Sequence, residues 1–219
     1  MKLNADHSQR VVVESLSLPW VASPMPGVSR RMLERDGAEQ ARATSIVRYE
    51  AGAGYESHIH GAGEEILVLE GTFEDEFGVY PAGTYIKNPA GSSHRPFSKE
   101  GCTIFVKLRY LKPDDAARVV VTPQASDWRP GMVEGLEVLP LSEFMGEHTA
   151  LVRWQAGTVF SPHRHYGGEE IFVLEGIFQD EFGEYPKGTW LRNPHLSAHR
   201  PFSNPGCTIL VKVGHLDVV

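Results

Sequence analysis

The sequence lacks most of the features that mark membrane, secreted or nucleic-acid-binding proteins. It has only two cysteines and no Cys-x-x-Cys pair, which argues against a cysteine metal site. No apolar run approaches the length of a membrane span, and the segment from Met1 to Arg10 has no apolar core of the kind found in signal peptides. The net charge is −7 and basic residues form no cluster, which argues against a nucleic-acid surface. We therefore expect a cytoplasmic protein whose partners include neither a membrane nor a nucleic acid.

A convincing helical period is missing as well. Short runs rich in Val, Ile, Phe, Tyr and Thr alternate with Gly, Pro and Asn, which is typical of strands joined by turns. In the first half we expect strands at 45–50, 64–70, 73–77, 84–87, 94–97 and 102–109, with a turn at Gly71. The least regular stretch, 32–43, is predicted to hold one short helix or an irregular loop. The pattern predicts an all-β sandwich, barrel or jelly roll.

A tandem repeat organises the chain. Residues 44–108 align without a gap with residues 149–213 and are identical at 38 of 65 positions. Upstream, the Arg-Val-Val-Val segment at 10–13 recurs at 118–121, and Trp20 corresponds to Trp128. Each repeat spans roughly 100 residues, a common domain size. We predict two domains, 1–113 and 114–219, which meet in the polar segment 112–117.

Each repeat carries three histidines and one glutamate at the same relative positions. In the first repeat, His58 and His60 are two residues apart, so an extended segment points both rings to one face. Glu64 opens the next strand on that face, and His94 must arrive from a neighbouring strand. Three imidazoles and one carboxylate form a complete transition-metal ligand set. The predicted metal ligands are His58, His60, Glu64 and His94 in the first repeat, and His163, His165, Glu169 and His199 in the second.

The pattern of identities favours metal binding over simple inheritance of these residues. Single histidines are usually surface or core residues, and over half of all aligned positions match. Between positions 53 and 63, however, only three of eleven residues match the second repeat, and two of the three are histidines. The remaining histidines are expected on the surface or in loops, although His195 lies only four residues before His199.

Other candidate residues have simpler structural explanations. The cysteines occupy equivalent strand positions and are expected to be buried and free, because a disulfide would require equivalent places of two barrels to meet. Adjacent strand residues face apart, so the acidic pairs are predicted to be solvated edge charges rather than acid/base catalysts. An apolar strand face next to the ligands suits either a substrate cavity or an inert core, and the core is the commoner case. The cysteines are Cys102 and Cys207, and the acidic pairs are Asp75-Glu76 and Asp180-Glu181. The apolar strand face comprises Ile66, Val68, Ile104 and Val106.

The ligand residues also carry a family pattern. The spacing G-x5-H-x-H-x3-E-x6-G runs from Gly52 to Gly71 and again from Gly157 to Gly176, and it resembles the first cupin motif. The second cupin motif, P-x-G-x2-H, resembles the segment from Pro89 to His94. In the second repeat Leu196 replaces its glycine, which puts the local turn shape in question. The resemblance implies a bicupin, with two tandem barrels of the double-stranded β-helix or jelly-roll type.

A narrower resemblance concerns the segments from Lys87 to Leu108 and from Arg192 to Val213, which are similar to the cupin domain of ChrR-type anti-sigma factors. That domain binds zinc and takes part in releasing a sigma factor under oxidative stress. The resemblance implies a regulatory or oxidative-stress sensing role. Sigma-factor binding is not implied, because ChrR-type proteins use a separate helical module with its own zinc site, which these segments do not resemble.

The same cupin subfamily is similar to enzymes that cleave β-diketones or aryl hydroxyketones, which implies a mononuclear non-haem metal dioxygenase as the alternative. A weaker third possibility is an isomerase or sugar-binding cupin. The expected cofactor is one divalent transition metal per barrel, with zinc favoured and iron, manganese or nickel as alternatives. Possible partners are a small molecule in the barrel and a second copy of the chain.

Overall fold

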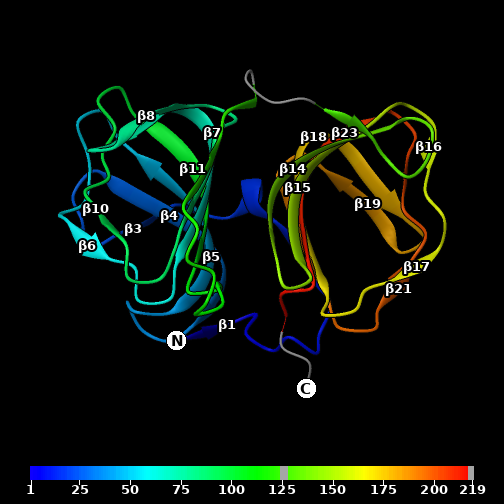
Figure 1. The fold of residues 1–219 in the computed structure, drawn as a ribbon, viewed down its shortest axis with the longest axis horizontal. Helices are drawn as coiled ribbons and strands as arrows, with labels where there is room; N and C mark the ends of the chain where they lie inside the picture. The colour runs from blue at the N-terminus through cyan, green and yellow to red at the C-terminus, as the bar shows by residue number, and fades with distance from the viewer. Residues whose placement is uncertain (124–127, 217–219) are drawn as a thin grey trace. The chain divides into compact units, whose positions relative to one another are not determined.

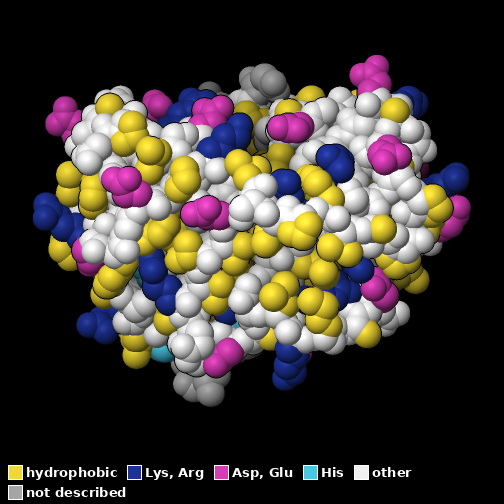
Figure 2. All heavy atoms as spheres, turned by 180° about the vertical axis from the view of Figure 1, so that it is seen from behind, with side chains coloured by type: hydrophobic (Ala, Val, Ile, Leu, Met, Phe, Trp, Pro, Cys, Tyr) yellow, Lys and Arg dark blue, Asp and Glu magenta, His cyan; other side chains and the backbone are white. Residues whose placement is uncertain are grey.

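The computed structural model describes residues 1–123 and 128–216, and these residues are almost entirely β (Figure 1). They include a three-residue 3₁₀ turn, η1 (Ser15–Ser17), and contain no α-helix. No helix among them is long and apolar enough to cross a membrane. On the face that Figure 2 shows, acidic and basic side chains are interspersed, and neither sign forms a continuous patch.

The first compact unit comprises Met1–Ala5 and Leu18–Ser126. Its main sheet is antiparallel, and the strands lie in the order β1, β4, β5, β11, β7, β9 and β12, with β3 paired to β4 and β8 paired to β7. A separate two-stranded ribbon joins β6 and β10. The strand bounds are β1 Lys2–Leu3, β3 Val21–Ala22, β4 Val28–Asp36, β5 Arg42–Tyr49, β6 His58–Ile59, β7 Glu64–Asp75, β8 Gly78–Pro81, β9 Tyr85–Asn88, β10 Ser93–His94, β11 Cys102–Leu108 and β12 Val119–Val121.

The second unit comprises Asp6–Ser17 and Asp127–Val219 and repeats this architecture. Its main order is β13, β14, β15, β23, β18, β20 and β2, with β19 and β22 on β18, β16 on β22, and a separate β17–β21 ribbon. The bounds are β2 Val11–Glu14, β13 Arg129–Pro130, β14 Leu136–Phe144, β15 Glu147–Trp154, β16 Thr158–Val159, β17 His163–Arg164, β18 Glu169–Asp180, β19 Gly183–Pro186, β20 Thr189–Asn193, β21 Ala198–His199, β22 Phe202–Ser203 and β23 Cys207–Val213.

The repeated Arg-Val-Val-Val segments provide the edge strands β2 and β12. Strand β2 pairs with β20 of the second unit, whereas β12, which lies at the start of the second repeat, pairs with β9 of the first unit. Each sheet is therefore completed by the first strand segment of the other repeat. The linear division 1–113 and 114–219 predicted from the sequence separates both edge strands from the sheets they join.

Two local predictions were wrong. The stretch 32–43 contains no helix, and only residues 37–41 form a loop, because β4 continues to Asp36 and β5 begins at Arg42. A register shift between Met32 and Glu34 interrupts the alternation of buried and exposed residues, which hides the strand in the sequence. Gly71 does not end its strand either. It lies within β7 at φ +71°, and a Cβ there would lie 2.2 Å from the Gly101 carbonyl oxygen, so the strand bends at a place that only glycine fits.

Apolar strand faces form a core in each unit. In the first unit the four residues Ile66, Val68, Ile104 and Val106 all belong to it. The two cysteines are buried and free, as predicted, and burial raises the pKa of each thiol to about 11. The core holds the strands in register, and this places the residues at the strand ends that form the candidate sites.

Candidate metal centres

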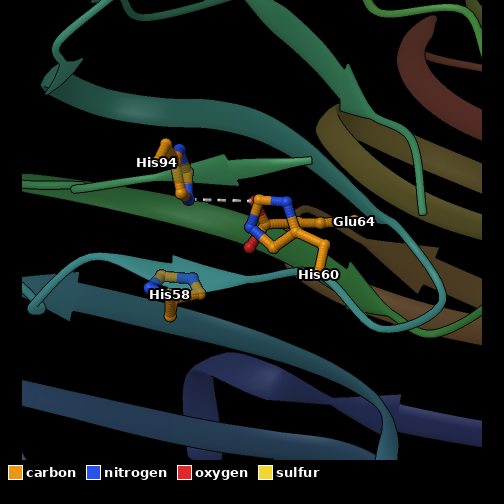
Figure 3. Close-up of side chains that lie close together, drawn as sticks. All are labelled: His58, His60, Glu64 and His94. Atoms are coloured by element: carbon orange, nitrogen blue, oxygen red, sulfur yellow. Dashed lines mark ion pairs between the residues drawn. The ribbon is translucent and has the colours of Figure 1, made fainter. Parts of the chain in front are cut away.

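The four predicted ligand residues of the first unit converge (Figure 3). His58 lies in β6 directly opposite His94 in β10, and His60 follows β6. Glu64 begins β7, and its Oε2 atom lies 3.3 Å from Nε2 of His60 and 3.5 Å from Nε2 of His94. One candidate ligand atom from each residue lies within 4.8 Å of the others. This cluster can hold a metal ion.

Hydrogen bonds fix the histidine rings so that their Nε2 atoms are available. Ser92 Oγ donates to the Pro89 carbonyl at 2.6 Å, so its proton is committed and it accepts from His60 Nδ1 at 3.0 Å. His58 Nδ1 donates to the carbonyl of Glu56 at 3.0 Å. Both rings therefore carry the proton on Nδ1, which leaves the Nε2 lone pair for a metal.

A carboxylate and an amide hold the other two candidate ligands. His94 Nδ1 donates to Asp75 Oδ2 at 3.3 Å, and Asn88 Nδ2 donates to Glu64 Oε2 at 3.2 Å. Burial would raise the pKa of the Asp75 carboxyl, but hydrogen bonds from His94, Tyr80 and the Phe77 N–H outweigh it and lower the pKa. Asp75 is thus an anionic acceptor that fixes the tautomer of His94.

The prediction that both acids of this pair are solvated edge charges was wrong for Asp75, which is buried, and for its counterpart Asp180. The alternation argument correctly separated the two faces, but it assigned the buried face to solvent. Glu76 is exposed, and its carboxylate accepts the backbone N–H of Arg95 at 2.8 Å. The signal that could have revealed Asp75 is its placement two residues after Phe73, on the same strand face as that core aromatic.

Arg118, next to β12, lies against both Asn88 and Asp75, the residues that support Glu64 and His94. Arg118 Nε donates to Asn88 Oδ1 at 3.3 Å, and its Nη2 donates to Tyr80 Oη at 2.8 Å and lies 3.9 Å from Asp75 Oδ2. One guanidinium therefore connects the partners of His94 and Glu64. Sequence reasoning missed this residue, although its segment recurs with the repeat.

The second unit reproduces the arrangement. His163 Nδ1 donates to the Ser161 carbonyl at 3.0 Å, His165 Nδ1 to Ser197 Oγ at 3.1 Å and His199 Nδ1 to Asp180 Oδ2 at 3.2 Å. Asn193 Nδ2 donates to Glu169 Oε2 at 2.9 Å. Arg10 makes the contacts that correspond to those of Arg118. Its Nε donates to Asn193 Oδ1 at 3.0 Å, and its Nη2 lies 3.4 Å from Asp180 Oδ2. The same network therefore supports both clusters.

Buried atoms in both clusters show that the residues fit a cation. Nε2 of His60, His94 and His199 is buried with no hydrogen-bond partner among the described residues. Leaving such groups unpaired in a protein interior is costly, whereas a divalent cation would supply the missing partner. Each unit can therefore hold one divalent metal ion through a His3Glu set.

A cavity of about 410 Å³ reaches the cluster of the first unit. All four candidate ligands line it, together with apolar side chains that include Phe73, Ile104 and Val106. Of the four lining residues predicted from the sequence, Ile104 and Val106 line the cavity, whereas Ile66 and Val68 contribute to the core alone. The volume suits a small molecule.

Two further predictions concern the second cluster. His195 is not part of it: its Nδ1 accepts the backbone N–H of Gly167 at 2.8 Å. Leu196 adopts φ +63°, close to the φ +80° of Gly91, so the turn keeps its shape although the glycine is replaced. His199 is therefore presented as His94 is. His7 and His215 lie in loops, in line with the expectation of a surface or loop position, and both are buried.

Comparison with known families gives the class of the protein. The model of the ChrR cupin-like domain matches residues 8–112 and again residues 116–217. The chain belongs to this family, and the predicted fold of two tandem cupin barrels is confirmed. No curated protein matches the sequence significantly.

Solved structures share the fold at low identity. A candidate dioxygenase from Nostoc punctiforme is 18% identical, with a TM-score of 0.76, over 97% of this chain and 85% of that chain. Oxalate decarboxylase from Lactobacillus farciminis, solved with formate, is 13% identical, with a TM-score of 0.67, over 99% of this chain and 90% of that chain. At these identities the similarity establishes the fold alone.

Proposed function

We propose that the first barrel is the catalytic centre of a mononuclear non-haem metal dioxygenase that acts on a small ketone or enol. The observation that carries this proposal is the cavity of about 410 Å³ that opens onto His58, His60, Glu64 and His94. A metal that prefers six ligands keeps two positions for exogenous groups when a protein supplies four. Such a metal would supply a chelation site for the two oxygen atoms of a diketone.

The residues of the chain have separate tasks in this proposal. His58, His60, Glu64 and His94 are the metal ligands, and their hydrogen-bond partners keep Nε2 of each ring directed at the ion. The apolar side chains of the cavity bind the carbon skeleton and exclude water, which strengthens electrostatic interactions at the ion. In the second barrel the ligands are His163, His165, Glu169 and His199.

Oxygen uptake by iron-loaded protein tests the proposal. The protein is purified without oxygen, loaded with Fe(II), and assayed with an oxygen electrode against β-diketones and hydroxyacetophenones. We expect uptake with at least one compound, its loss in His60→Ala, and its retention in the matched second-barrel variant His165→Ala. Absence of uptake across the panel, or uptake that survives His60→Ala, contradicts the proposal.

The family match of both repeats favours a second candidate, a metal-dependent regulator or oxidative-stress sensor. Zinc held by four protein ligands forms a closed site without redox chemistry. This candidate is expected to retain two zinc ions per chain after purification without added metal and to consume no oxygen with any metal. Elemental analysis combined with the electrode assay separates the two functions. A cytoplasmic location and a homodimer stay predictions, and light scattering tests the dimer.

A further inference from the structure

Three arginines line the cavity of the first barrel, and two of them share one carboxylate partner. Glu39 accepts hydrogen bonds from Arg30 at 3.2 and 3.0 Å and lies 3.8 Å from Arg35 Nη2. Within the described residues, no carboxylate forms an ion pair with the third, Arg109. Arg109 is exposed to solvent and therefore presents a guanidinium without a carboxylate partner among these residues at the cavity that reaches the metal centre.

The backbone at Arg109 favours a different residue. Its φ is +65°, in the left-handed region where a side chain costs free energy and glycine does not. The equivalent residue of the second repeat is Gly214, at φ +79°. The first barrel therefore keeps a long cationic side chain at a place where the same fold uses glycine. Strain of this kind concentrates at ligand-binding sites.

A neighbouring position changes together with Arg109. A Cβ on Gly61 would lie 2.9 Å from Arg109 Nη1, so glycine leaves room for the guanidinium beside the residue that follows His60. In the second repeat the residues that correspond to Gly61 and Arg109 are Tyr166 and Gly214. The pair Gly61 and Arg109 thus places a cation beside the ligand loop, and the pair Tyr166 and Gly214 does not.

We infer that Arg109 binds a carboxylate on the substrate of the first barrel, so that the substrate is an anionic keto acid or its enol. This inference rests on the proposed function, because it assigns the other end of the substrate to the metal centre. A guanidinium matches a carboxylate with two parallel hydrogen bonds. Among the acids that line the cavity, Glu64 belongs to the ligand cluster, and the exposed Glu56 pairs with none of the arginines.

Binding to the Fe(II)-loaded protein in the absence of oxygen, which supports no oxidative turnover, tests the inference. Acetylpyruvate and acetylacetone are both β-diketones, and they differ by a carboxylate in place of a terminal methyl group. By calorimetry we expect acetylpyruvate to bind at least about tenfold more tightly. Arg109→Gly should remove this preference and leave acetylacetone affinity unchanged, whereas Arg109→Lys should retain part of it. The control Arg95→Ala removes an exposed arginine that does not line this cavity, and it should retain the full preference.

Each outcome is interpretable. Arg109→Gly suits the left-handed backbone, so its melting temperature should not fall, and a lost preference cannot be assigned to misfolding. Equal affinities for the two compounds in the native protein, or a preference that survives Arg109→Gly, overturn the inference. If acetylpyruvate binds preferentially but iron-loaded protein consumes no oxygen with it, the proposed reaction fails while the substrate class stands.

Discussion

The two barrels have matching metal clusters, but they differ at positions whose side chains line the cavity of the first barrel. Tyr49 and Tyr55 of the first barrel correspond to Trp154 and Phe160 of the second, and the strand register aligns Arg30 with Val138. By the same register Arg35 corresponds to Glu143, and Arg109 corresponds to Gly214. The side chains that support the histidines and glutamate are in contrast equivalent in both units. In our proposal, ion binding is therefore common to both barrels, whereas recognition of the substrate is assigned to the first barrel.

The largest expected effect concerns metal content, which tests whether each of the two clusters holds an ion. We expect metal content near two per chain for protein purified without added metal, because both clusters have the same ligands and supports. His60→Ala and His165→Ala should each remove one ion, and the double variant should remove both, as measured by elemental analysis. His148→Ala changes an exposed histidine outside the clusters and is the control. Content that stays unchanged in either single variant contradicts the assignment for that barrel.

The buried aspartates provide the next largest effect. Asp75→Asn should weaken metal binding in the first barrel by about 10- to 100-fold, since His94 loses an anionic acceptor that fixes its tautomer. The affinity is measured by competition with a chelating dye in the His165→Ala background, where one site remains. Asp180→Asn in the His60→Ala background should give the same loss for the second barrel. A loss in one barrel only would show that the supports are not equivalent.

The edge-strand arginines test whether each centre depends on a segment outside its own repeat. Arg118→Met should weaken metal binding in the first barrel by up to about tenfold, because Asn88 and Asp75 lose a shared partner. Second-barrel affinity should not change, although Arg118 belongs to the second repeat. Arg10→Met should show the reverse dependence. An effect confined to the adjacent repeat would contradict the observed strand pairing.

The smallest difference concerns one turn. Leu196→Gly should stabilise the protein by about 1 kcal/mol, because φ +63° at this position is unfavourable for leucine. For a chain of this size that is an increase of about 2–4 °C in melting temperature, measurable by calorimetry. The reciprocal Gly91→Leu should lower it. A Cβ on Gly91 would meet no atom within 4 Å, so this substitution tests the backbone conformation with little steric effect.

Local spacing explains what could be predicted. The His-x-His segments and the following glutamates lie close together in the sequence, so their spacing predicted three ligands of each cluster, although they belong to separate strands joined by a turn. The supporting role of Asp75 could not be predicted in this way, because it depends on a hydrogen bond with His94, which lies on a different strand. The strand β4 was hidden by its register shift, since a bulge reverses the facing of every residue that follows it.

The sequence by itself determined the duplication, the all-β character and the candidate ligands, because identity, alternation and residue chemistry are properties of short segments. Only the tertiary structure decided which residues support those ligands and which segment completes each sheet. Arg118 meets Asn88 and Arg10 meets Asn193 because edge strands pair with distant neighbours. Backbone hydrogen bonding and side-chain packing select such partners in three dimensions, and the order of residues along the chain does not encode the selection locally.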